Sequence, residues 1–429
     1  LSGAVPTAVI TATGAAALRF NSLTLNAGGT LTANASTITM DGNLDFSAGT
    51  FAFDTSTVVI ATDGANVTVP GTASRTVNHF YNLTFNNAVT IGALGGATSI
   101  ANVWAFGGAG GGGIGSGWGT IFLNSGAATP IVAGASFSLA GPTLIAMNNS
   151  TSYNMPTGTF SSALVFQMEN NTAPAAALTA TMTGNLSSGG FSIGVFGNTN
   201  TVTLAVGTNT LTGTRTGTWS LNLGNSAGLR VGALTVTSGT VTLSGGFQTD
   251  TADSYVTFGS STWTVGESWT NVTTSSNWAA GTGTVTFSSA TGGTMTFAGA
   301  NLAEDEFFNV TFASTGVASQ TFTMTTRGLR LGAALVIDST SILAKATFTL
   351  TVGTTLTLGA GEANALTSTS GAVTIGTDVS VADVTAYIDL GSEAWTVSGT
   401  WTDSTTSASW YAVTGTVTFD SATGGTMTF

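Results

Sequence analysis

The sequence predicts an all-β protein: a parallel, right-handed β-helix, or β-solenoid, built from imperfect repeats, with tandem β-sandwich domains as the alternative. Three observations support this. Apolar residues alternate with Thr and Ser in short runs, charged residues are scarce, and one long segment occurs twice. Residues 263–297 and 395–429 align without a gap at an offset of 132, with 25 of 35 positions identical. Such repetition is typical of units that stack on one another.

The alternating runs begin near Ser22 and include SLTLNA, TLTANA, TITMDGNLDF and TFAFDT. Alternation with a period of two, punctuated by Gly, Asn or Asp, predicts strands joined by turns. Thr, Val, Ile and Phe also suit a pleated sheet. Because no window shows a convincing amphipathic helix, we predict strands throughout.

Two shorter repeats favour the solenoid over the sandwich. FYNLTF at 80–85 recurs as FFNVTF at 307–312, and the GLR motif at 228–232 recurs at 328–332, an offset of 100. Between the GLR motif and the Trp-rich segment the second unit therefore has 32 additional residues (132 − 100), within 333–383, and these also have the strand pattern. A solenoid accommodates extra strands as added coils. A closed sandwich would have to rebuild an edge.

We divide the chain into three segments. Residues 1–20 are apolar and are expected to act as a docking strand between subunits. Residues 21–214 form a first solenoid part, and residues 215–429 form a second that contains the Trp-rich duplication. From 77 to 168 there is no Asp, Glu, Lys or Arg. This indicates either a surface covered by another copy, another chain or glycan, or a neutral surface hydrated by Thr, Ser and Asn.

Composition excludes several function classes. Charged residues make up 6% of the chain and its net charge is −12, so it lacks the clustered Lys and Arg of nucleic-acid-binding proteins. Cys is absent, so no disulfide is expected. The sequence contains no run of about 18 apolar residues, so no transmembrane helix is predicted. Scarce Lys beside abundant Thr, Ser and Asn favours an extracellular or cell-surface location, with any signal peptide already removed.

The strands FYNLTF and FFNVTF, with TVTF…GGTMTF before the latter, resemble those of very large secreted repeat proteins of bacteria and archaea. These include filamentous-haemagglutinin-like and autotransporter-like adhesins. The resemblance covers most of residues 20–429. It implies a right-handed parallel β-helix displayed outside the cell, in adhesion, matrix or surface-layer roles.

We therefore predict an extracellular structural protein, a β-solenoid subunit that assembles into a filament, sheath or surface layer. Phe429 is the counterpart of Phe297, so the sequence stops within a repeat. We expect either a fragment of a longer protein or a homopolymer in which another subunit continues the stack head to tail. The alternative is an adhesin or glycan-binding module, and the third hypothesis is a polysaccharide-active β-helix enzyme. We predict no catalytic residues, no metal site and no cofactor.

The candidate contact residues are six Trp of the duplication. They could form a platform on which sugar rings stack, or a structural ladder in the core, where Trp is more often found with its N–H satisfied. The alternation Trp263, Val265, Glu267, Trp269 places both indoles on one face of a strand. The six are Trp263, Trp269, Trp278, Trp395, Trp401 and Trp410.

Two acidic motifs are weaker candidates. Glu304-Asp305-Glu306 is the densest acidic cluster, but catalysis on a glycan requires several groups that converge, and we interpret it as a solvated loop. Asp41-Gly42-Asn43-Leu44-Asp45 matches the opening of a calcium loop, without the Gly and Glu that should follow. Because Leu44 and Phe46 continue a strand, we predict a hydrated strand edge there.

The remaining motifs point to structure. Gly107–Gly119 contains G-x-G-x-x-G, but no helix follows to bind a phosphate, so we predict a loop. Repeated Thr-x-Thr could order water, as in ice-binding proteins, although Thr is simply a good strand former. Asn82 and Asn309 begin sequons that permit N-glycosylation.

Overall fold

The computed structural model describes residues 9–70, 78–86, 90–91, 93–95, 98–106, 112–114, 120–132, 137–139, 144–170, 177–197, 201–217, 219–224, 231–273, 277–297, 306–316, 318–338, 340–359, 365–382, 386–404, 410–411 and 414–428. Within these residues the chain forms β-strands and no α-helix. The strands are parallel and stack as a β-solenoid of about 14 turns. This confirms the all-β solenoid that the sequence predicts.

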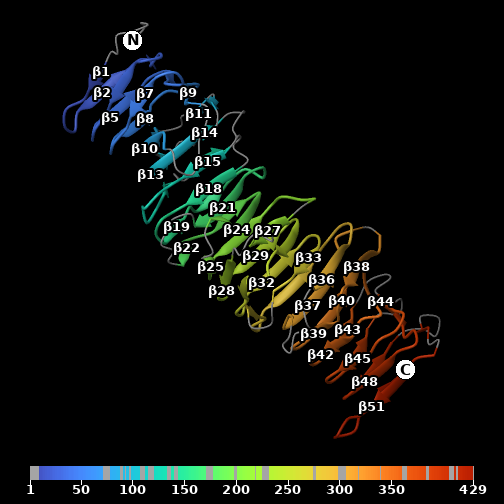
Figure 1. Ribbon diagram of the computed structural model, residues 1–429. Helices are drawn as coiled ribbons and strands as arrows, with labels where there is room; N and C mark the ends of the chain where they lie inside the picture. Colours follow the sequence, from blue (N-terminus) through green and yellow to red (C-terminus); the bar gives the residue numbers. More distant parts are fainter. Residues whose placement is uncertain are drawn as a thin grey trace. The chain divides into compact units, whose positions relative to one another are not determined.

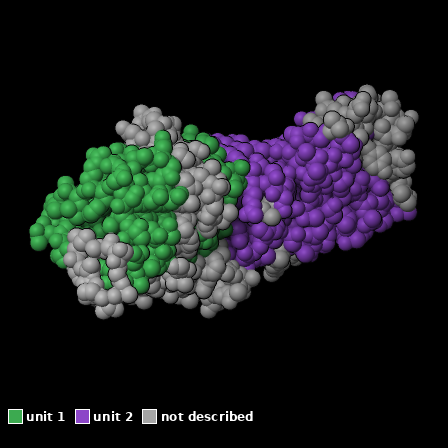
Figure 2. Space-filling model, turned by 90° about the horizontal axis from the view of Figure 1, so that it is seen from above, with its two compact units in different colours: residues 1–205, 230–232 green, residues 206–229, 233–429 purple. Residues whose placement is uncertain are grey.

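The chain divides into two compact units (Figure 2). Unit 1 comprises residues 1–205 and 230–232, and unit 2 comprises residues 206–229 and 233–429. Nowhere in the described chain is there a helix with the length and hydropathy needed to cross a bilayer.

In the first coils of unit 1, each strand pairs with the strand three places later. Val9 pairs with Thr30, Thr37 with Thr57 and Leu44 with Val67, separations of 21, 20 and 23 residues per coil. The part of segment 1–20 that is described therefore lies in the first coil of its own solenoid. The strands of these coils are β1 (Val9–Thr11), β2 (Ala17–Phe20), β3 (Leu23–Thr24), β4 (Thr30–Thr32), β5 (Thr37–Met40), β6 (Leu44–Asp45), β7 (Thr50–Ala52), β8 (Thr57–Ile60) and β9 (Asn66–Thr68).

Further strands continue this stack through unit 1. They are β10 (Phe80–Phe85), β11 (Thr90–Ile91), β12 (Ala93–Gly95), β13 (Thr98–Phe106), β14 (Gly112–Ile114), β15 (Thr120–Leu123), β16 (Ile131–Val132), β17 (Phe137–Leu139), β18 (Leu144–Asn148), β19 (Tyr153–Met155), β20 (Gly158–Thr159), β21 (Val165–Asn170), β22 (Leu178–Met182), β23 (Leu186–Ser188), β24 (Gly190–Gly197) and β25 (Val202–Gly207).

The strands of unit 2 form ladders of parallel strands on three faces, and the third face has two separate ladders. Figure 1 shows the strands stacked one above another along the chain. The first ladder is β26 (Thr210–Gly213), β29 (Thr240–Leu243), β32 (Thr262–Val265), β35 (Thr284–Phe287), β37 (Asn309–Ala313), β40 (Leu335–Asp338), β43 (Leu356–Leu358), β46 (Val379–Val381), β49 (Trp401–Asp403) and β52 (Met427–Thr428). The second is β27 (Trp219–Leu223), β30 (Gly246–Thr249), β33 (Trp269–Asn271), β36 (Gly293–Phe297), β38 (Gln320–Thr325), β41 (Ser341–Ala346), β44 (Ala365–Ser368), β47 (Tyr387–Asp389) and β50 (Trp410–Tyr411). The third face has β28 (Gly232–Val236), β31 (Tyr255–Thr257) and β34 (Trp278–Ala279), and after these β39 (Leu329–Leu331), β42 (Leu350–Val352), β45 (Val373–Ile375), β48 (Ala394–Val397) and β51 (Thr416–Phe419).

The alternation of the sequence decides which side chains form the core. In β32, Trp263 and Val265 are buried while Thr262 and Thr264 face outward, and most other strands follow the same pattern. In-register pairing then stacks apolar residues on apolar residues of the next coil. Each fully buried Val or Leu contributes roughly 1.5–3 kcal/mol, so the stacked rows are the main source of stability.

The duplicated segments form the same strands with the same register. The strands of the first segment pair with one another in a register that recurs at an offset of 132 in the second. Trp263 pairs with Val285 and Trp269 with Met295, as Trp395 pairs with Val417 and Trp401 with Met427. They nevertheless lie on different faces, because β32 belongs to the first ladder whereas its counterpart β48 belongs to the third. The segment specifies strands and register without specifying the face.

The prediction that Trp263 and Trp269 share one strand face is wrong. Trp263 lies in β32 and Trp269 in β33, with a turn between them. Gly266 permits this turn, since a Cβ there would lie 2.3 Å from the carbonyl oxygen of Ser244 in the coil below. Both indoles point into the core from adjacent faces.

The other repeats are also explained by coil stacking. Asn82 pairs with Thr57 in unit 1, and Asn309 pairs with Thr284 in unit 2, so the offset of 227 preserves the register. Most of the inserted stretch 333–383 forms β40 to β46, and each of these strands pairs in parallel with the next coil. The insertion therefore adds coils, as expected for a solenoid.

Candidate functional site

Five of the six candidate Trp lie in the core of unit 2. Trp263, Trp269 and Trp395 are 0% exposed, Trp401 is 1% exposed and Trp278 is 2% exposed. An indole buried on both faces offers no surface on which a sugar ring can stack. Of the two interpretations, burial favours the structural ladder. The sixth residue, Trp410, lies in β50, and its side chain is outside what the structure describes.

The first three Trp form the centre of an aromatic cluster. The ring of Trp269 stacks on Phe247 at 4.2 Å between centroids and meets Phe307 edge to face at 5.0 Å. Trp263 Nε1 donates to Ser261 Oγ at 2.8 Å, and Trp278 Nε1 donates to the carbonyl oxygen of Glu306 at 2.6 Å. The cluster is thus packed ring against ring, and the indole N–H groups at its two flanks are bonded.

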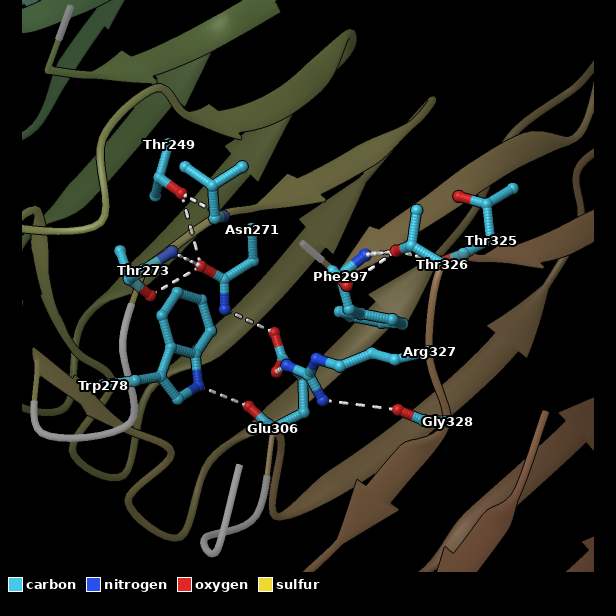
Figure 3. Close-up of polar contacts among 11 residues, drawn as sticks. Thr249, Asn271, Thr273, Trp278, Phe297, Glu306, Thr325, Thr326, Arg327 and Gly328 are labelled. Carbon is cyan, nitrogen blue, oxygen red and sulfur yellow. Dashed lines mark hydrogen bonds and ion pairs between the residues drawn. The ribbon is translucent and has the colours of Figure 1, made fainter. Parts of the chain in front are cut away.

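Glu306 is the main polar residue of this core, and the prediction of a solvated loop is wrong for it (Figure 3). Its side chain is fully buried, with Oε2 2.7 Å from a guanidinium nitrogen of Arg327. Its Oε1 accepts a 2.7 Å hydrogen bond from Asn271 Nδ2. Glu304 and Asp305 lie outside the described residues.

Asn271 connects Glu306 to the coil below. Its Oδ1 accepts hydrogen bonds from Thr273 N at 2.9 Å, Thr273 Oγ1 at 2.6 Å and Thr249 Oγ1 at 3.2 Å. The cluster therefore joins β30 and β33 to Glu306, three residues before β37, and to Arg327, two residues after β38. Buried polar networks of this kind are costly to disrupt because every member relies on the others.

The electrostatics of Glu306 are those of a buried ion pair. Burial raises the pKa of its carboxyl, and the charge of Arg327 and the hydrogen bond from Asn271 oppose that rise. The guanidinium carbon of Arg327 also lies 5.1 Å from the ring centroid of Phe297. Because both carboxylate oxygens are occupied and fully buried, the arrangement suits a clamp between coils better than acid–base catalysis.

Unit 1 has a different residue at the equivalent position. An offset of 227 aligns Glu306 with His79, which is buried beside the ring of Phe46 at 6.3 Å between centroids. Burial lowers the pKa of the His79 imidazole. Both units thus place an ionisable residue in the core just before the FYNLTF or FFNVTF strand.

A second ion pair is buried in the later coils of unit 2. Lys345 Nζ lies 2.6 Å from Glu393 Oε1, and both side chains are inaccessible to solvent. Lys345 also donates to the carbonyl oxygens of Phe348 and Ser370 at 2.8 and 3.0 Å. Burial lowers the pKa of Lys345 and raises that of Glu393, and each partner opposes the shift of the other. The alternation Ser341, Leu343, Lys345 is the signal that could have placed this Lys inside.

The calcium-like motif is engaged in contacts of its own. Asp41 pairs with Arg19, which lowers the pKa of the Asp41 carboxyl. Asn43 Oδ1 accepts from the backbone N–H of Asn66, and Asp45 Oδ1 accepts from Ser47. Leu44 and Phe46 are buried, as the strand-edge prediction requires. No group of three His, Asp or Glu side chains suited to a metal ion occurs among the described residues.

The Gly-rich stretch, the two sequons and the Thr-x-Thr strands were the remaining motifs of the sequence. Most of Gly107–Gly119 is outside the described residues, apart from β14, which pairs with β11 and β17. The sequon residues Asn82 and Asn309 both bridge to the next coil through Oδ1, which accepts from Asn102 Nδ2 at 2.9 Å and from Ala334 N at 3.1 Å respectively. Thr-x-Thr strands align in ranks, for example Thr240, Thr262 and Thr284. Water ordering by these ranks stays a prediction.

Sequence reasoning missed the exposed indole of Trp219. In TWSLNL, period-two alternation puts Trp219 on the same face as Leu221 and Leu223. The structure instead has a β-bulge at Ser220, which shifts the register between Trp219 and Leu221. Ser220 is buried and Trp219 is turned outward, 37% exposed. Bulges commonly re-aim a side chain in this way.

No family model matches this chain, and no curated protein or solved structure matches it. The assignment of function therefore rests on the geometry described above.

Proposed function

We propose that the protein is an extracellular structural protein, a β-solenoid subunit whose coils stack on those of another copy to build a filament, sheath or surface layer. The observation that carries the proposal is that the two copies of the duplicated segment pair with coils of different sequence. The segment packs with one register on two different underlying coils: Trp263 pairs with Val241 and Trp395 with Val373, whereas Trp269 pairs with Phe247 and Trp401 with Val379.

One coil sequence can therefore stack on more than one underlying coil, and we propose that this includes a coil of a second copy. Parallel pairing needs only a matching strand length and an alternating pattern, and neutral Thr-rich faces avoid repulsion between copies. The edge of β51 and β52 presents Phe419 and Met427, which are partly exposed. A further coil from a second copy would bury them as β38 buries Met295. The charge-free stretch 77–168 is proposed as a second contact surface.

Assembly is tested by sedimentation velocity over a range of concentrations, followed by negative-stain electron microscopy of the purified 429-residue protein. We expect polymers with a constant repeat that grow with concentration. Phe419→Lys places a charge on the inward side of the edge strand and should abolish them. Ser260→Lys, at an exposed turn, is the matched control and should leave them intact. A single species at every concentration would contradict the proposal.

A further inference from the structure

The outer face of β27 and β30 combines features that the stacked core does not require. Trp219 is the one Trp among the exposed large apolar residues of the described chain. Its ring lies over Gly246, where a Cβ would sit 3.0 Å from Cε3 of the indole. A Cβ at this position would also lie 2.6 Å from the carbonyl oxygen of Ser268, so only glycine leaves room here for the indole, which packs beside the strand and remains 37% exposed.

The bulge that turns Trp219 outward is held by side-chain contacts. Ser220 Oγ donates to the carbonyl oxygen of Arg215 at 2.6 Å and accepts from Gly245 N at 2.8 Å. Glu267 Oε1 accepts a 2.6 Å hydrogen bond from Gly217 N, which fixes the turn before Trp219. The indole therefore has a defined orientation, which lowers the entropic cost of binding a ligand.

A group of amides and one carboxylate lies further along the same two strands. Asn222 pairs with Gln248 in the ladder, and both face outward beside Asp250. Asn222 Nδ2 donates to one Asp250 oxygen at 3.0 Å, and Gln248 Nε2 donates to the other. Each oxygen of Asp250 keeps lone-pair capacity for another donor, and Gln248 retains its amide oxygen as an acceptor.

The spacing of these groups suits one sugar ring. Gly246, which contacts the indole, and Gln248 are two residues apart along β30. This separation is about 7 Å, at 3.3–3.4 Å per residue. A pyranose has an apolar C–H face that stacks on an aromatic ring and hydroxyls at its rim that donate to carboxylate and amide oxygens. An amphipathic aromatic beside a few fixed polar groups is the usual composition of such a site.

We propose that Trp219, Gln248 and Asp250 form a subsite for a neutral glycan, with a pyranose ring stacked on the indole and its hydroxyls donating to Asp250 and Gln248. Asn222 is a positioning residue that orients Asp250. The carboxylates of Asp250 and Glu267 disfavour anionic sugars. This site is independent of the proposed assembly, which involves other strands.

The test is native affinity gel electrophoresis with three soluble neutral polysaccharides: hydroxyethyl cellulose, laminarin and galactomannan. At least one should retard the protein. Trp219→Ala should weaken that retardation at least tenfold, Trp219→Phe should retain part of it, and Asp250→Asn should weaken it severalfold. Tyr255→Ala removes an aromatic side chain that is 45% exposed, more than Trp219, from another face, and it should have no effect.

Three results would overturn the proposal: no retardation by any of the polysaccharides, unchanged retardation of Trp219→Ala, or equal loss in Tyr255→Ala. Circular dichroism of each variant checks the fold. If Trp219→Ala does not fold, Trp219→Phe and Asp250→Asn decide the outcome. Sedimentation without polysaccharide measures assembly separately, so failure of one proposal does not imply failure of the other.

Discussion

The two copies of the Trp-rich segment share strands and register but differ in what covers them. Over the first copy, β37 and β38 add the next coil, and Met295 is 1% exposed. Its counterpart Met427 is 50% exposed, and no strand within the described residues pairs with the far edge of β52. Burial in this protein is therefore a property of the neighbouring coil, whereas strand register is a property of the segment itself.

The largest difference between the copies is expected at the central indole. Trp269 packs against six aromatic rings, those of Phe247, Phe258, Trp263, Trp278, Phe287 and Phe307. Trp269→Ala should therefore lower the free energy of unfolding by about 3–5 kcal/mol. Trp401 packs on Trp395 and Phe419 at the less covered end, so Trp401→Ala should cost less.

Guanidinium unfolding followed by far-UV circular dichroism measures both variants, and hydrogen exchange locates the loss along the chain. Equal losses, or a larger loss for Trp401→Ala, would show that the covering coil does not determine the contribution of the indole.

A second, smaller difference concerns Asn271, which aligns with Asp403. Asn271 Nδ2 donates to Glu306. Asn271→Asp makes the first copy resemble the second and sets two buried carboxyls against each other. We expect a loss of roughly 1–3 kcal/mol, the cost of leaving a buried polar group unsatisfied. Asp403→Asn is the reverse change in the second copy and should cost less. Unfolding midpoints at pH 7 compare the two variants. If Asn271→Asp leaves the stability unchanged, the contact between Asn271 and Glu306 does not hold the coils together.

The comparison also shows what sequence can and cannot reveal here. Period-two alternation and the repeats at offsets of 132 and 227 can be read from the sequence alone, so they predicted the strands and the solenoid. The burial of Glu306 depends on Arg327 and Asn271, which reach it from other coils, and no pattern around EDEFF indicates that. Trp219 was missed for a local reason, because one extra residue at the bulge reverses the alternation before it.

The smallest expected effect is the pH dependence that Glu306 confers on the covered copy. Its pKa is raised in the folded chain, chiefly by burial and against the opposing charge of Arg327. The folded state thus holds this proton more tightly than the unfolded state. The resulting stabilisation is complete below the unfolded pKa and is lost as pH rises through the folded pKa.

Lowering the pH from 7 towards 5 should therefore stabilise the wild-type protein relative to Glu306→Gln. The gain should be smaller than the losses expected for Trp269→Ala and Asn271→Asp, because the charge of Arg327 opposes the effect of burial on the pKa. Glu393 has a pKa raised in the same sense, but it is present in both proteins, so its effect cancels in the difference. Guanidinium unfolding of both at pH 7, 6 and 5 gives this difference directly. If wild type instead loses stability relative to Glu306→Gln as the pH falls, the charge of Arg327 outweighs burial, and Glu306 acts as an ordinary stabilising carboxylate.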